Sequence, residues 1–225
     1  DLPRNPANYQ PLTPLTFLER AASVFPDHTA IIHGDLRRSY AEFYARSRQL
    51  ASALTQHNVG RGDTVSVMLA NTPAMLECHY GVPMCQAVLH AINTRLDAAV
   101  IAFQLDHAEA KIVIVDSEFM PVMQEALKKA IVAPLLIQYD DAEYDAPKTA
   151  VSQKTDVVAL DYEGFVAAGD ASAARGAGAA GDVGPAAAAL RRPVRRLLRR
   201  LRARDADKRR GAQLVAARAH RAVRG

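Results

Sequence analysis

Between Arg37 and Asp116, helical patterns alternate with short apolar runs, and a few turn-forming residues separate each segment from the next. Alternation of this kind is typical of parallel strands that are connected by crossover helices. An all-helical or all-β arrangement would contradict it. We therefore predict an α/β fold over residues 12–170, with a layered, mostly parallel sheet and crossover helices.

The chain opens with a Pro-rich stretch without periodicity, which we expect to lie as an extended arm over the domain surface. Thr13 and Pro14 then suit the N-cap and the first position of a helix that Pro26 stops. Two strand-like runs, residues 29–33 and 36–40, flank Gly34-Asp35 and predict a hairpin. The expected apolar face of the first helix consists of Leu15, Leu18, Ala22 and Phe25.

A longer helix follows the hairpin, because Ser39 and Glu42 form a capping box. We expect this helix to end near His57, where Asn58 and Gly60 are both able to take the left-handed conformation that ends helices. The remaining expected elements are a helix from Asn71-Thr72-Pro73 that Pro83 kinks or ends, strands at residues 64–69, 87–92, 111–115 and 135–139, and helices at residues 97–107, 119–130 and 162–168.

The composition changes abruptly near Asp170. Residues 1–170 contain 13 Lys and Arg against 21 Asp and Glu, whereas residues 171–225 contain 15 against 3. All 13 Tyr and Phe also precede Gly169. We therefore divide the chain into a partial N-terminal domain, residues 1–170, and a basic, helical or disordered Ala/Arg-rich tail, residues 171–225.

Two interpretations of the tail stay open. Ala, Arg, Gly and Pro make up 39 of its 55 residues, and a reading-frame slip in a GC-rich gene would give this non-native composition. Alternatively, the tail is a binding module whose arginine-flanked helix docks on nucleic acid or an anionic membrane. The apolar stripe of that helix consists of Leu190, Val194, Leu197, Leu198 and Leu201.

Four side chains with metal-ligand chemistry lie close together in the sequence: Cys78, His79, Cys85 and His90. Their spacing lacks the paired knuckles, such as Cys-x2-Cys, of a structural zinc site. Both thiols also fall within an apolar helical pattern, where buried cysteine is an ordinary core residue. We therefore assign no metal ligands in this chain.

Asp106, His107 and Glu109 have acid–base chemistry, but no nucleophile lies near them in the sequence, and we interpret them as charged residues at a helix end. Arg61-Gly62-Asp63 is interpreted as a turn. Gly60-x-Gly62 precedes a strand and lacks a third glycine, so it does not fit a dinucleotide-binding loop. No catalytic or cofactor-binding residue is assigned.

Several separated segments occur in the order and spacing found in the N-terminal part of AMP-forming acyl-CoA synthetases. The chain resembles this adenylate-forming family over about residues 3–170, and within it the medium-chain acyl-CoA ligase branch most closely. The segments that carry the resemblance are residues 12–22, Ser39-Tyr40-Ala41-Glu42, Gly62-Asp63-Thr64-Val65, Asn71-Thr72-Pro73, Asn93-Thr94-Arg95-Leu96 and Ile114-Val115-Asp116.

The resemblance implies a parent enzyme that joins a carboxylic (fatty) acid to ATP with Mg²⁺ and passes the acyl group to coenzyme A. It also implies a phosphate-gripping loop, which should begin some 15–25 residues after Asp170, and residues 171–225 contain no such sequence. We therefore expect an inactive fragment that binds none of these cofactors well. Two further departures are Gln86 and Asn58, which stand where the family usually has Gly, and Gln86 places a side chain at a site of close approach.

Two cysteines cannot make a disulfide framework, no secretory signal opens the chain, and no apolar run approaches 18 residues. We expect a cytoplasmic protein without a transmembrane segment and without a specific nucleic-acid partner. Because the sequence begins at Asp1 without a methionine, we expect its true start to lie upstream. The sequence leaves the oligomeric state open.

Overall fold

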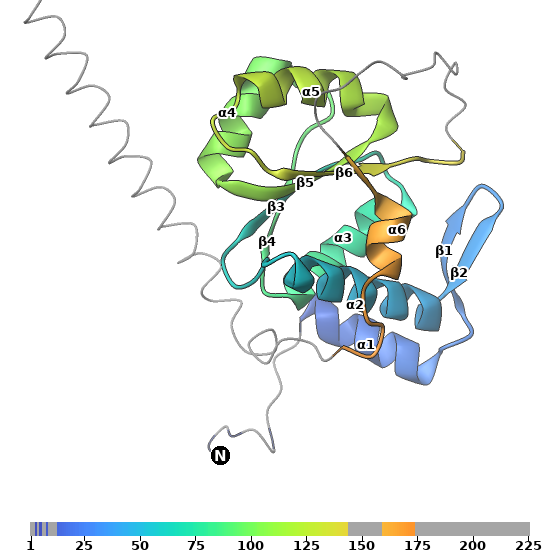
Figure 1. The fold of residues 1–225 in the computed structure, drawn as a ribbon. Coiled ribbons are helices and arrows are strands. Elements are labelled where there is room, and N and C mark those ends of the chain that lie inside the picture. The colour runs from blue at the N-terminus through green and yellow to red at the C-terminus, as the bar shows by residue number, and fades with distance from the viewer. Residues whose placement is uncertain (1–2, 4, 6–7, 9–12, 144–158, 174–225) are drawn as a thin grey trace, which may run out of the picture. The chain divides into compact units, whose positions relative to one another are not determined.

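The computed structural model describes residues 3, 5, 8, 13–143 and 159–173. Its centre is a five-stranded parallel sheet with the strand order β4-β3-β5-β6-β7 (Figure 1). The predicted α/β fold with a mostly parallel sheet is therefore confirmed. The strands are β3 (Thr64–Met68), β4 (Val88–Ala91), β5 (Ala110–Asp116), β6 (Leu135–Tyr139) and β7 (Leu160–Asp161).

Helices cover both faces of the sheet, with α4 and α5 on one face and α2, α3 and α6 on the other (Figure 1). Helix α1 packs outside α2 and α3 and buries Leu15 and Leu18 against Phe43 and Met84. The helices are α1 (Pro14–Val24), α2 (Tyr40–Gln56), α3 (Pro73–Met84), α4 (Ala98–Ala108), α5 (Met120–Lys129) and α6 (Tyr162–Ala167), with a short 3-10 helix at Ser117–Phe119.

The two faces of β3 and β5 belong to different hydrophobic cores. Ile112 and Ile114 pack on the side of α2, α3 and α6, whereas Val113 and Val115 pack on the side of α4 and α5. Because both faces are buried, every residue of β3 is buried as well. This explains why β5 reads as a continuous apolar run from Ile112 to Val115, and why β3 buries even its polar residues Thr64 and Ser66.

The predicted helix starts are formed as the sequence indicates. Thr13 and Ser39 each accept a hydrogen bond from the backbone N–H three residues later, and Thr72 and Asp97 cap α3 and α4. The predicted face of α1 is wrong at its end. Phe25 is 51% exposed, because the helix ends at Val24 and the chain turns away at this residue.

Within the described residues, three that are not glycine have left-handed backbone angles: Asn58 with φ of 59°, Gln86 with φ of 65° and Glu109 with φ of 49°. Asn58 thus ends α2 as predicted, but Gly60 does not take this conformation, and Gly62 does instead, with φ of 82°. Gln86 lies between α3 and β4. A residue with a β-carbon is strained there, so the family's usual glycine has a conformational reason.

The predicted hairpin is present as an antiparallel pair of β1 (Thr29–His33) and β2 (Leu36–Ser39). Its tip is tied to the chain that leaves β6, because His33 Nε2 lies 2.8 Å from Asp141 Oδ1. This contact joins residues that are far apart in the sequence and was not predicted.

A buried carboxylate joins four elements on the α2 side of the sheet. Glu77 of α3 is completely buried and receives hydrogen bonds from Arg38 of β2 and Arg46 of α2. The hydroxyl of Tyr162, at the start of α6, donates to the same carboxylate at 2.8 Å. Arg46 also reaches Glu163 at 2.9 Å. We call Glu77, Arg38, Arg46 and Tyr162 the Glu77 cluster.

The cluster raises the pKa of two of its members, Arg46 and Tyr162. Burial disfavours the charged form of Arg46, but the hydrogen bonds and charge of Glu77 outweigh this cost and raise the pKa of the guanidinium. Burial, with the charges of Cys78 and Glu77, raises the pKa of Tyr162. The phenol therefore remains a hydrogen-bond donor to a charged acceptor.

Replacing Glu77 with Gln should destabilise the fold by about 3 kcal/mol or more, since two guanidinium groups lose their buried counter-charge. Urea unfolding followed by circular dichroism measures this change. Glu163→Gln is the matched control, because Glu163 is 52% exposed and contacts the same Arg46. We expect that variant to change the free energy of unfolding by no more than about 0.5 kcal/mol. Equal effects of the two substitutions on the free energy of unfolding would show that the Glu77 cluster is not the main contact between these elements.

Replacing Gln86 with Gly should raise the free energy of unfolding by up to about 1 kcal/mol, because glycine takes the left-handed conformation without strain. Gln86→Ala keeps the β-carbon and serves as the control, and we expect no gain in its free energy of unfolding. Asn58→Gly should also change the free energy of unfolding little, since asparagine tolerates this conformation. A gain in the alanine variant as large as in the glycine variant would contradict the backbone explanation. Chemical denaturation of the three variants gives the comparison.

Candidate functional site

The order of the strands identifies the edge at which a ligand is expected. The chain passes from β3 to β4 on one side and then returns past β3 to β5 on the other. In open parallel sheets, ligands bind outside the carboxyl ends of the strands at such a switch point. The residues that follow β3 and β5 therefore mark the candidate site.

A pocket of about 350 Å³ lies on the β3 side of this edge. Strand β1, the residues after β3 and the first turns of α3 form its walls. Apolar walls come from Ile31, Pro73 and Met75, and the hairpin contributes the strongly exposed Ile32. Its polar side chains are His33, Asn71, Thr72 and His79. A pocket of this size and mixed lining suits a small organic molecule.

Asp116 marks the end of β5. Its side chain is almost completely buried, and Oδ1 accepts a hydrogen bond of 3.1 Å from the backbone N–H of Glu118. Burial raises the pKa of this carboxyl group, and the neighbouring charges of Asp141, Glu118 and Asp140 raise it further. Burial, followed by the charges of Asp141 and Glu163, raises the pKa of Tyr139 to about 12.

The charge of this edge is negative among the described residues, because carboxylates follow both β5 and β6. Such surroundings repel a triphosphate, so these residues alone do not fit ATP. The part of the chain where the resemblance places a phosphate-gripping loop lies outside the described residues. We therefore assign no catalytic step to the residues of this edge. We interpret the edge as one wall of a site, with an apolar pocket in it.

The sequence candidates for a metal site are separated in the structure. Cys78 is fully buried in α3, and burial raises the pKa of its thiol. His79 Nδ1–H donates to Met75 O, Cys85 donates to Val82 O, and His90 pairs with the buried Ser66 Oγ at 2.9 Å. In the part of the chain that the structure describes, no three His, Cys, Asp or Glu side chains are grouped to hold a metal ion.

The acid–base candidates at the end of α4 have structural contacts. Asp106 Oδ1 accepts hydrogen bonds from the backbone N–H groups of Ile131 and Val132, and His107 stacks on Phe103. Glu109 is the left-handed C-cap of α4. The interpretation as a helix end is therefore consistent with the contacts of Asp106 and Glu109. Arg61-Gly62-Asp63 lies in the predicted turn, which Asp63 closes through hydrogen bonds to Gly60.

The sequence analysis did not single out His33, Asp116 or Asp141 as site residues. Asp116 had a usable signal, since it directly follows the most strand-like run of the chain. His33 and Asp141 had none, because only the folded chain brings the hairpin to the end of β6.

Replacing Asp116 with Asn should stabilise the fold at pH 7, because the ordinary carboxylate is ionised there while its burial favours the neutral form. The asparagine keeps an acceptor for Glu118 N–H. The gain should shrink as the pH falls through the raised pKa and vanish below the ordinary pKa of aspartate. Urea unfolding across this pH range is the measurement, with the exposed Glu125→Gln on α5 as control. A gain that is independent of pH would exclude ionisation as its cause.

The chain matches the family described as AMP-binding enzyme over residues 18–183. It is 45% identical over 179 residues to an acetate–CoA ligase of Humulus lupulus, covering 76% of this chain and 31% of that protein. It is 41% identical over 177 residues to a peroxisomal acetate/butyrate–CoA ligase of Arabidopsis thaliana, again covering 76% and 31%. The chain thus spans about a third of the length of the curated relatives that it matches.

Solved structures share the fold. The anthranilate CoA ligase AuaEII in complex with anthranoyl-AMP matches with a TM-score of 0.62 and 17% identity, over 72% of this chain and 29% of that one. A benzoate CoA ligase from Burkholderia xenovorans LB400 matches with a TM-score of 0.59 and 22% identity, over 72% and 30%. Together with the family match over most of its length, this parallel sheet shows that the chain belongs to the AMP-binding enzymes.

Proposed function

We propose that this chain is the amino-terminal part of an AMP-forming carboxylic acid–CoA ligase. The parent enzyme would join a carboxylate to ATP, which gives an acyl-adenylate and pyrophosphate, and then transfer the acyl group to the thiol of coenzyme A. The observation that carries this proposal is the family match over residues 18–183, together with relatives that are named as acid–CoA ligases.

Within that enzyme, this chain supplies scaffold and one wall of the acyl pocket. Two observations support this role. The described residues form both hydrophobic cores of the sheet, and the carboxyl edge carries an apolar pocket of about 350 Å³ without a grouped metal site. ATP, Mg²⁺ and coenzyme A would then depend on parts of the enzyme beyond the described residues, and the chain alone would be inactive.

The substrate that we propose is a small carboxylic acid. Relatives of the chain are named as ligases of acetate, butyrate and benzoate, and the sequence resemblance favours medium-chain acids. The pocket beside β1 has apolar walls, which suits a short apolar acyl chain. Acetate, butyrate and octanoate together cover this range in an assay.

The division at residue 170 and the nature of the tail remain proposals. The family match ends at residue 183, and residues 174–225 lie outside the described part of the chain. None of the helices described is long and apolar enough to cross a membrane. The cytoplasmic setting stays a prediction, and two relatives of Arabidopsis thaliana are peroxisomal by name.

A chimera tests the proposed role. Residues 13–173 of this chain replace the matching segment of the Humulus lupulus acetate–CoA ligase, to which it is 45% identical. We expect the chimera to release pyrophosphate and form acyl-CoA with at least one of the three acids, whereas the 225-residue chain alone releases none.

The controls separate folding from function. A chimera that carries Glu77→Gln should lose protein stability and activity together, whereas one that carries Glu163→Gln should keep both. Turnover by the isolated chain would overturn its role as an incomplete part. A folded chimera without any ligase activity would overturn the proposal that this segment is the scaffold of an acid–CoA ligase.

A further inference from the structure

The pocket beside β1 extends along both of its walls. Its lining runs over residues 30–33 in β1 and, at the start of α3, from Thr72 to His79. Three strand steps of about 3.3 Å and seven helix steps of about 1.5 Å each amount to about 10 Å. The pocket is therefore long enough for an extended acyl chain of several carbons.

One end of the pocket lies at the carboxyl edge of the sheet. Asn71 and Thr72 follow β3 at this edge, and His33 contacts Asp141, which follows β6. From there α3 leads back towards the start of β4 at the opposite edge. An acyl chain whose carboxyl group is at the switch point therefore points along α3, with Leu76 about 6 Å further along than Thr72.

Two aliphatic side chains line this pocket from different walls and are also accessible to solvent. Ile32 of β1 is 68% exposed and Leu76 of α3 is 38% exposed. Their neighbours in the sequence point into the protein, because Ile31 is buried in the core beside α1 and Glu77 is completely buried. Shortening Ile32 or Leu76 would therefore widen the pocket without leaving a cavity in a hydrophobic core.

The hairpin wall is held at both of its ends. At the base, Arg38 donates to the buried carboxylate of the Glu77 cluster. At the tip, His33 Nε2–H donates to Asp141 Oδ1 at 2.8 Å. A β-carbon at Gly34 would clash with the Glu143 side chain, so the tip lies directly against the segment after β6. These contacts resist displacement of β1 by a ligand.

We propose that Ile32 and Leu76 limit the length of the acyl chain that the pocket accepts, and that the His33–Asp141 contact keeps their separation. A short chain ends before it reaches the two side chains, whereas a longer chain has to pass between them. The inference rests on the proposed function, because it takes this pocket as the acyl pocket of an acid–CoA ligase.

The chimera described above provides the test, with butyrate and octanoate as the two acids. Ile32→Ala and Leu76→Ala should each raise the ratio of kcat/KM for octanoate to kcat/KM for butyrate about tenfold, because the long chain then meets less hindrance. The change should lie in KM for octanoate, since these side chains contact the chain and not the reacting carboxylate. Ile131→Ala is the matched control, since Ile131 is 82% exposed and lies outside the lining, and it should leave the ratio unchanged.

Asp141 is expected to act as a positioning residue. Asp141→Ala should raise the same ratio, because the hairpin tip is released, whereas Asp141→Asn keeps an acceptor for His33 Nε2–H and should keep the selectivity. Rescue by asparagine separates positioning of the wall from a general loss of stability, and circular dichroism of each variant checks folding. Equal selectivity of the two variants would exclude the positioning role.

The outcomes for the inference and for the proposed function are distinct. An active chimera whose selectivity is unchanged by Ile32→Ala and Leu76→Ala, or changed equally by Ile131→Ala, would contradict the inference and leave the proposed function intact. A folded chimera without ligase activity would remove the proposed function, and binding then decides the inference. Octanoate titrated into the full 225-residue chain should shift the methyl NMR signals of Ile32 and not those of Ile131. Unchanged Ile32 signals would reject the inference as well.

Discussion

The carboxylate of Glu77 in α3 holds side chains of three other elements together. It is completely buried, and its partners come from the hairpin, from α2 and from α6. A buried charge is costly unless every partner is in place, so we expect these contacts to form and to break together. The position of α6 depends on it twice, since Tyr162 donates to Glu77 while Glu163 pairs with Arg46. The hairpin, and with it one wall of the candidate pocket, is anchored at the same point through Arg38.

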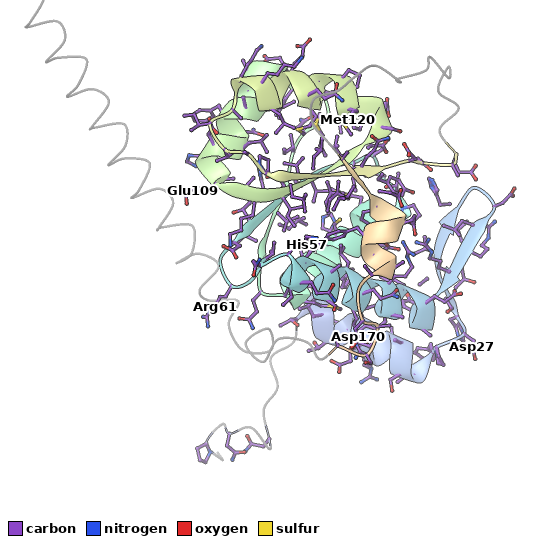
Figure 2. The ribbon with its side chains drawn as sticks, viewed as in Figure 1. Asp27, His57, Arg61, Glu109, Met120 and Asp170 are labelled. Atoms are coloured by element: carbon purple, nitrogen blue, oxygen red, sulfur yellow. The ribbon has the colours of Figure 1, made fainter. Side chains whose placement is uncertain are left out.

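Close backbone approaches support this ion-pair cluster. A β-carbon at Gly81 would come within 2.8 Å of the Leu50 side chain, and one at Gly169 would clash with Gln49 O. Helix α3 and the segment that follows α6 therefore both lie directly against α2. His57, which Figure 2 labels at the end of α2, has its ring centroid 4.9 Å from that of Phe165 in α6. Helix α2 is thus the surface on which the elements of this face are assembled.

Local signals predicted nearly all of the fold, because caps, prolines and apolar periodicity are properties of neighbouring residues. Thr13, Ser39 and Thr72 cap the helices that they were expected to start, and β6 has the predicted bounds. The features that were not predicted are either very short elements or contacts between residues far apart in the sequence. Strand β7 has only two residues and is defined by its pairing with β6. Glu77 reads as a polar residue in a helix, and nothing near it in sequence reveals that Arg38, Arg46 and Tyr162 will surround it. The candidate site needed the strand order, which fixes the switch point, and the sequence alone does not specify that order.

The strand order also has a consequence for biosynthesis. Strand β3 lies between β4 and β5, and both of these neighbours follow it in the chain. As the polypeptide leaves the ribosome, both edges of β3 are unpaired until β4 has been made, and one edge stays unpaired until β5 is complete at Asp116. Its residues are all buried in the finished fold, so a nascent chain shows this apolar segment to other proteins for the whole of that interval. Residues 64–68 would therefore be accessible to nascent-chain chaperones until β5 and Asp116 have been made.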